Sequence, residues 1–139
     1  MNFVFQVKNY IVGQKPQYTM SPVPLWKLAA NAGPYVKLAA ASGAIAVALG
    51  AYEKYLVDYE QEHRRVFETA NRYHFIHTLT LLSLPLCRAP FLAATFHVSG
   101  IIMFCGSCYY HAFTGDEKFK VVTPAGGVCF ILGWLAMLL

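Results

Sequence analysis

The sequence predicts an all-α membrane protein, a bundle of four transmembrane helices with an amphipathic connecting helix and an N-terminal irregular arm. Of the 139 residues, 57% are hydrophobic and 13% are charged, whereas an ordinary globular domain has roughly a quarter of its residues charged. Four apolar runs follow one another, and a spanning helix needs roughly 20 apolar residues, so the chain has room for about four spans. This length and composition exclude a large catalytic domain outside the membrane.

The N-terminal arm, residues 1–34, is expected to be extended or irregular, with at most a short helix near residues 25–30. It contains four of the seven prolines, among aromatic and polar residues without sustained periodicity. Its lysines and Lys37 precede the first acidic residue, Glu53, so the first third of the chain is purely basic. An acid-free basic start is typical of a mitochondrial targeting segment. We therefore expect residues 35–139 to form a multi-pass domain in the mitochondrial inner membrane, with the targeting segment retained.

The first predicted span, residues 35–56, carries small residues on one helical face. They recur at spacings of four, three and four, and we call them the small-residue stripe: Ala39, Gly43, Ala46 and Gly50. Lipid gives helices no hydrophobic reason to associate, so small residues let two backbones approach and gain van der Waals contact. We expect the stripe to be a helix-packing surface. The alternative is that the membrane merely tolerates small residues there.

A charged stretch, residues 53–72, keeps apolar residues at helical spacing on one side, which predicts an amphipathic helix at the membrane surface. Glu60 with Arg64, and Glu68 with Arg72, are spaced four apart and favour this helix by about 0.2–0.5 kcal/mol each. Interface anchors are expected near its end and in the next hairpin, at Glu68, Arg72, Tyr73, His74 and Arg88. A proton or lipid-headgroup site beside Glu68 and Arg72 is the alternative.

Three further spans are predicted at residues 71–87, 90–113 and 122–139. Arg88-Ala89-Pro90 is expected to form a tight hairpin between the second and the third. Thr123 can cap the fourth span and Pro124 can open it. Within this last span we expect close packing at Gly126, Gly127 and Gly133. Lysines and arginines are nearly balanced between the two sides, so their count does not decide the orientation.

Several stretches together resemble a known family. They are Ser42 to Tyr52, Phe67 to His74 with His77, Phe104 to Tyr110, Thr114 to Asp116, Thr123 to Gly127, and Leu132 to Leu135. In this order they resemble the "domain of unknown function 423" family, whose animal members are called transmembrane protein 256, over roughly residues 38–139. The resemblance implies a small multi-pass membrane protein, mitochondrial in animals, and it implies no activity. Many members continue the first helix with a Gly-Ala-His turn, where this chain has Tyr52-Glu53-Lys54.

Two histidines are candidates for a cofactor site. Counted from the Arg88 hairpin at about 1.5 Å per residue, His77 lies roughly 16 Å deep and His97 roughly 13 Å deep, so the two rings can face each other. Facing imidazoles suit a haem or a metal. Alternatively, each ring hydrogen-bonds to a neighbouring helix, as buried polar groups generally do. Cys105 and Cys108 have dithiol spacing, but they lie late in an apolar helix, where nothing activates a thiolate.

No nucleophile with a partner base, carboxylate pair or phosphate-binding loop is evident in the sequence, so we expect a protein that is not an enzyme and needs no cofactor. The predicted function is that of an accessory subunit of a respiratory complex or supercomplex, in contact with lipid and with larger subunits through its helices and arm. The alternatives are a self-associating small-solute transporter or channel, using the stripe as its contact, and a haem-binding or thiol redox protein. A basic face suited to nucleic acid is absent.

Overall fold

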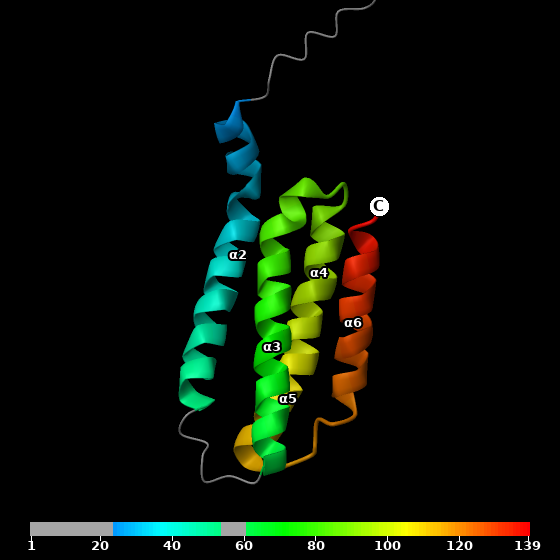
Figure 1. Cartoon of the computed structure of the whole chain (residues 1–139). Coiled ribbons are helices and arrows are strands. Elements are labelled where there is room, and N and C mark those ends of the chain that lie inside the picture. Colours follow the sequence, from blue (N-terminus) through cyan, green and yellow to red (C-terminus); the bar gives the residue numbers. More distant parts are fainter. Residues whose placement is uncertain (1–23, 54–60) are drawn as a thin grey trace, which may run out of the picture.

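The structure is a computed structural model that describes residues 24–53 and 61–139, and the regular elements in these two ranges are all helical. They are α2 (Leu25–Tyr52), α3 (Gln61–Ser83), the short 3₁₀ helix η2 (Leu84–Leu86), α4 (Pro90–Gly100), the π-helical turn η3 (Ile101–Cys105), α5 (Gly106–Thr114) and α6 (Val122–Ala136). In Figure 1, α2, α3, α4 and α6 lie side by side; η3 and α5 continue α4, and we call these three segments together the third rod. The carboxyl end lies beside the α3–α4 hairpin.

Helix α2 begins ten residues before the expected boundary of the irregular arm. Residues 25–34 are helical, and Pro34 lies inside the helix, so the short helix allowed at residues 25–30 is present, whereas the expectation that residues 31–34 are irregular was wrong. The residues before Pro34 are mostly leucine, lysine and alanine, which are strong helix formers. A single proline removes one backbone hydrogen bond but does not end the helix here. Residues 1–23, the rest of the predicted arm, lie outside the described residues.

Helix α3 combines two elements that we predicted separately. The charged stretch and the second span form one continuous helix, Gln61–Ser83, because neither glycine nor proline interrupts the sequence between these residues. Residues 54–60, the first part of the predicted connecting helix, lie outside the described residues. The helix gives way to η2 at Pro85, and the Arg88 hairpin then turns the chain into α4.

The third rod contains a π-helical turn at its centre. Gly100 and Gly106 flank this turn, η3, and such single wide turns insert one extra residue into an α-helix. The rod ends at Gly115, which has φ 71° and donates its N–H to the carbonyl of His111 at 2.8 Å. Glycine adopts this left-handed conformation without a Cβ penalty, so α5 stops there.

The buried core has two parts along the bundle. Phe67 and Ala70 of α3 pack against Cys105, Tyr109 and Phe130 near the end where α5 meets α6. At the hairpin end, a second cluster contains Ala39, Leu81, Leu84, Ala93, Ala94 and Ala136. Helix α6 packs mainly on α4 and η3, whereas α2 packs mainly on α3 and η2. One side of α2 therefore lies apart from the centre of the bundle.

Within residues 24–53 and 61–139, two helical segments are long and apolar enough to cross a membrane. They are Ala32–Tyr52, and Pro90–Thr114 in the rod of α4, η3 and α5; the apolar helix α6 is shorter. Large apolar side chains also face outward from the bundle, such as Leu79 of α3, Ile102 of η3 and Ile131 of α6. Exposed apolar surface of this extent indicates a membrane or protein partner rather than water.

Candidate functional site

A chain of hydrogen bonds between side chains joins α2, α3 and α5 inside the bundle. Ser42 Oγ of α2 lies 2.6 Å from Thr78 Oγ1 and 3.0 Å from His74 Nε2, both on α3. His74 Nδ1 lies 3.4 Å from the hydroxyl of Tyr109 on α5. Asn71 Nδ2 donates to the same hydroxyl at 3.1 Å. We call these residues the polar chain: Ser42, Asn71, His74, Thr78 and Tyr109.

Two arrangements of protons fit the polar chain. Either Thr78 donates to Ser42, Ser42 to Nε2 of His74 and Nδ1 of His74 to Tyr109, or all three bonds run in the opposite direction, from Tyr109 to Thr78. Asn71 also donates to the backbone carbonyl of Ala46 at 2.8 Å. An unmade bond is costly where water is excluded. The polar chain therefore holds three helices in register.

The small-residue stripe of α2 lies against α3. Ala39 and Ala46 are buried, and a Cβ added at Gly43 would lie 3.4 Å from Thr78 Cγ2. A Cβ added at Gly50 would lie 3.2 Å from Asn71 Oδ1. The close approach allows Asn71 to reach the backbone of α2. The stripe thus has its partner within the same chain, so the oligomer contact that we assigned to it under the transporter hypothesis is not available.

The predicted packing glycines of α6 differ in how tightly they are enclosed. A Cβ at Gly126 would lie 2.9 Å from the carbonyl carbon of Met103, within η3. A Cβ at Gly133 would lie 2.8 Å from Cε1 of His97. At Gly127 it would make only an ordinary contact, 3.9 Å from the ring of Phe104. Gly126 and Gly133 therefore let α6 approach its neighbours closely, and Gly127 contributes little to this approach.

His77 and His97 do lie next to each other, with ring centroids 5.5 Å apart and planes tilted by 40°. His77 Nδ1 donates to the carbonyl of Tyr73 at 2.7 Å, and its Nε2 accepts from Trp134 Nε1 at 3.3 Å. The ring of Phe130 stacks on His77 at 3.5 Å. Both nitrogens of His77 are therefore occupied, and an aromatic ring covers one of its faces.

His97 is fully buried, and neither of its ring nitrogens has a hydrogen-bond partner in residues 24–53 and 61–139. Its ring meets Trp134 edge to face, with centroids 5.6 Å apart. No group of three metal-ligating side chains occurs in this described part of the chain. The pair does not fit a haem, because an iron between the rings would have to displace the partners of His77. The two histidine rings instead take part in aromatic packing between α3, α4 and α6.

The predicted interface anchors do not all lie where we expected them. His74 is buried in the polar chain, so its assignment as an anchor was wrong. In the described residues Glu68 pairs with Arg64 at 3.3 Å, and the expected ion pair with Arg72 does not form. Arg64 also approaches Glu53 at 3.8 Å, which ties the end of α2 to the start of α3. Arg72, Tyr73 and Arg88 are exposed.

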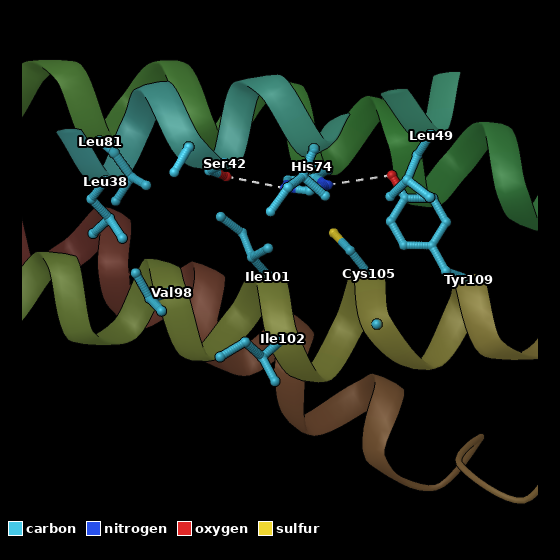
Figure 2. A pocket seen from close by; sticks show the side chains of 13 residues that line it. Leu38, Ser42, Leu49, His74, Leu81, Val98, Ile101, Ile102, Cys105 and Tyr109 are labelled. Atoms are coloured by element: carbon cyan, nitrogen blue, oxygen red, sulfur yellow. Dashed lines mark hydrogen bonds between the residues drawn. The ribbon is translucent and has the colours of Figure 1, made fainter. Parts of the chain in front are cut away.

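Several pockets flank the third rod in the described part of the chain, and two of them lie on different sides of it. The first has a volume of about 440 Å³ and lies between α2 and the rod; Figure 2 shows the side chains around it. The second, about 390 Å³, lies near the α5–α6 loop, where Lys120 lowers the pKa of Glu117 by donating to its carboxylate at 3.0 Å. Cys105 lines the first pocket and Cys108 the second. The two thiols therefore do not form a shared dithiol surface.

Comparison with known proteins identifies the family. The family described as "Protein of unknown function (DUF423)" matches residues 46–127, more than half of the chain. This chain belongs to the DUF423 family. The identification confirms the resemblance that the sequence motifs indicated. No solved structure matches this DUF423 chain.

Bacterial membrane proteins are similar to this DUF423 chain along most of its length. The "UPF0382 membrane protein" of Haemophilus influenzae is 30% identical, covering 74% of this chain and 89% of its own. The "UPF0382 inner membrane protein YgdD" of Escherichia coli is 33% identical, with 72% and 82% covered. A Staphylococcus epidermidis relative, "UPF0382 membrane protein SERP0230", is 30% identical, with 76% and 92% covered. Together with the two candidate spans, these relatives establish an all-α membrane protein.

The polar chain of this DUF423 protein was not predicted from its sequence. Asn71, His74 and Thr78 follow one another at spacings of three and four, which places them on one helical face. That spacing could have indicated a shared polar face. We assigned only His74 among the three, and we assigned it as an interface anchor. Ser42 lies next to the small-residue stripe, whose close packing brings its hydroxyl within reach of α3. Tyr109 comes from a distant helix and carries no comparable signal.

Proposed function

We propose that this protein is a non-catalytic accessory subunit of a larger respiratory assembly, and that it crosses the mitochondrial inner membrane four times. The feature that carries the proposal is the amino-terminal part of α2, which extends past the α3–α4 hairpin (Figure 1). Trp26 in this segment is 67% exposed, and Lys27 lies 5.6 Å from its ring centroid. An exposed aromatic residue beside a cation on a projecting helix is suited to contact with a partner subunit.

The outer face of α2 continues this surface into the membrane. Val36 and Val47 are both exposed, because α2 packs mainly through its small-residue stripe. The polar side chains in the interior bond to one another across three helices, as a structural role requires. The outer face of α2 can therefore pack against a transmembrane helix of a larger assembly.

The mitochondrial part of the proposal rests on two observations, and the respiratory part follows from that compartment alone. The first third of the chain is basic and free of acidic residues, as targeting segments are. The Escherichia coli relative is named an inner membrane protein. Support for four crossings comes from the outward-facing apolar residues of the two remaining rods, such as Leu79 of α3 and Ile131 of α6. Cysteine labelling from each side of the membrane, at positions in the loops, tests the number of crossings.

The experiment for the accessory role uses the full chain in native membranes. A photocrosslinking residue at Trp26 or Val36 should capture a larger membrane protein, and the protein should comigrate with a respiratory complex after mild extraction. The same residue at Leu135, on the outer face of α6 and 53% exposed, serves as the matched control and should not capture it. Deletion of residues 1–30 should abolish comigration while insertion persists. Unchanged comigration after the deletion contradicts the proposal.

A second candidate, a small-solute or proton transporter, is favoured by the polar chain. Its hydrogen bonds run continuously from Thr78 through Ser42 and His74 to Tyr109, and connected protonatable groups inside a membrane are a common feature of proton relays. The experiment is proton flux into liposomes that contain the purified protein, with His74→Gln as the variant. A flux that His74→Gln abolishes favours this candidate, and no flux above protein-free liposomes removes it.

A further inference from the structure

The pocket between α2 and the third rod is a narrow groove along the bundle. One wall is a single face of α2, with Leu38, Ala41, Ile45 and Leu49 at spacings of three and four. The other wall comes from α4, η3 and α5, including Val98, Ile102, Cys105 and Gly106. His74 and Leu81 of α3 lie between the two walls (Figure 2). This groove face of α2 adjoins the small-residue stripe but is distinct from it.

The cross-section of the groove limits what can fill it. From Leu38 to Leu49 the groove follows about 16 Å of helix, at about 1.5 Å per residue. A volume of about 440 Å³ over that length gives a mean cross-section of roughly 27 Å². An α-helix with side chains is about 10–12 Å across and needs roughly 80 Å² or more. A hydrocarbon chain, whose carbons pack at about 4 Å, needs roughly 20 Å². The groove therefore has room for a hydrocarbon chain, whereas a whole helix does not fit inside it.

The chemistry of the groove also favours hydrocarbon. Apart from Ser42, His74 and Tyr109, the lining side chains are hydrocarbon, except for the thiol of Cys105. The three polar side chains already bond to one another. The groove lies between the two segments that are long and apolar enough to span a membrane. Ile45 at 55% exposure and Ile102 at 67% mark its open edges. A lipid chain can therefore enter sideways from the bilayer.

Charge at the hairpin end of the groove identifies the class of lipid. Lys37 is exposed and precedes Ala41 by one helical turn, which places it on the groove side of α2, just beyond the lining residues. A lysine on a long aliphatic stem can extend to the headgroup layer. At the opposite end, Arg64 is paired with Glu53 and Glu68. We propose that the groove binds one acyl chain of an anionic phospholipid, with the phosphate at Lys37.

The test uses the full chain in lipid nanodiscs that contain phosphatidylglycerol with a photoreactive diazirine on one acyl chain. After illumination, mass spectrometry of the peptides locates the label. The label should concentrate on the groove residues Ile45, Ile101 and Ile102, and it should exceed the label on Ile131, which faces outward from α6. Equal labelling of Ile131 and the groove residues overturns the proposal, because such a pattern means that lipid contacts the whole outer surface of the bundle without a specific site.

Two variants that fill the groove supply the decisive comparison. Ala41→Leu and Gly106→Leu place side chains into the groove from opposite walls, and an added Cβ at Gly106 meets nothing within 4 Å. Each should reduce groove labelling at least threefold. Ala40→Leu, on the far side of α2 and exposed, is the matched control and should change nothing. Circular dichroism and thermal unfolding verify the fold of each variant. Undiminished labelling in folded Ala41→Leu and Gly106→Leu overturns the proposal.

The role of Lys37 is tested separately. Lys37→Gln should reduce labelling by the phosphatidylglycerol probe to the level given by a phosphatidylcholine probe with the same acyl chain. Equal labelling by the two probes in the unchanged protein contradicts the anionic headgroup. Crosslinking of Ile45 or Ile102 to a second copy or to another protein, in place of lipid, overturns the site itself. These readouts do not depend on the respiratory partner, so the groove and the accessory role can fail independently.

Discussion

Ser42 of α2 and His74 of α3 are joined by a hydrogen bond of 3.0 Å between Oγ and Nε2. Ser42 is the member of the polar chain that comes from α2, and it also contacts Thr78 at 2.6 Å. The bond lies beside the small-residue stripe, where the two helices approach most closely. Helix α2 packs mainly on α3, so this bond and the contact of Asn71 with the Ala46 carbonyl are the main polar links that hold it.

Replacing Ser42 with alanine should loosen α2. The change leaves His74 and Thr78 without their shared partner, and such bonds between membrane helices contribute about 0.6 kcal/mol on average and up to about 1.7 kcal/mol. We expect a loss of about 1 kcal/mol in the free energy of unfolding, measured by denaturant titration in detergent micelles. Thr95→Ala is the control, because Thr95 bonds only within its own helix on an exposed face. Equal losses in the two variants would contradict the role of Ser42.

Gly126→Ala should destabilise the packing of α6 on η3. The new Cβ would meet the backbone of Met103 and Phe104, which cannot rotate away, and overpacking of this kind costs about 1–3 kcal/mol. Gly106→Ala, also in an apolar helix, places its Cβ in open space. It should keep or slightly raise the midpoint of thermal unfolding, since alanine favours helix over glycine. A Gly126→Ala protein as stable as the unchanged one would show that α6 lies further from η3 than it does in this structure.

His97→Leu should leave the protein at least as stable as the unchanged protein. The variant loses an edge-to-face contact with Trp134, worth about 0.5–1.5 kcal/mol. It also removes two buried nitrogens that lack partners in the described residues, which each cost about 1–3 kcal/mol to bury. The two effects oppose each other. His77→Leu, which loses two bonds in addition, should unfold at lower denaturant than His97→Leu. The reverse order would indicate that His97 has a bound ligand.

A haem titration of the purified protein should show no saturable shift of the Soret band from that of free haem to that of histidine-ligated haem. Iron coordination would require His77 to give up its bond with either Tyr73 or Trp134, and Phe130 already stacks on the ring. The measurement is a haem titration followed by optical spectroscopy, with apomyoglobin as the positive control. A saturable shift of the Soret band that His97→Leu removes would revive the haem hypothesis.

The fate of the small-residue stripe illustrates how far sequence reasoning reached. Its face is set by helical spacing, so Ala39, Gly43, Ala46 and Gly50 can be grouped without coordinates. Its partner depends on which surface elsewhere is complementary, and that surface is α3, with Asn71 and Thr78 against the glycines. We had assigned the stripe to an oligomer under one hypothesis. Local periodicity carries no information about whether the partner lies in the same chain or in another.

His77 and His74 show the same limit of sequence reasoning: the predicted neighbour of His77 was correct, whereas the predicted position of His74 was wrong. The depth of His77 and His97 follows from helical rise alone, and the rings do lie side by side. The depth of His74 is equally calculable, yet it was assigned to the interface because its neighbours Glu68, Arg72 and Tyr73 are polar or interfacial. Its burial depends on the direction of its side chain toward Tyr109, which is decided by the packing of α5 against α3.

The sequence by itself determined that the chain is helical and lies in a membrane, because apolar content and helical spacing are properties of each segment alone. It also determined the family through motifs that lie along most of the chain. The tertiary structure decided what those segments meet: the polar chain, the internal partner of the stripe, the aromatic environment of His77 and the groove beside α2. Contacts between residues distant in the sequence depend on how whole helices pack, and no local pattern encodes that packing.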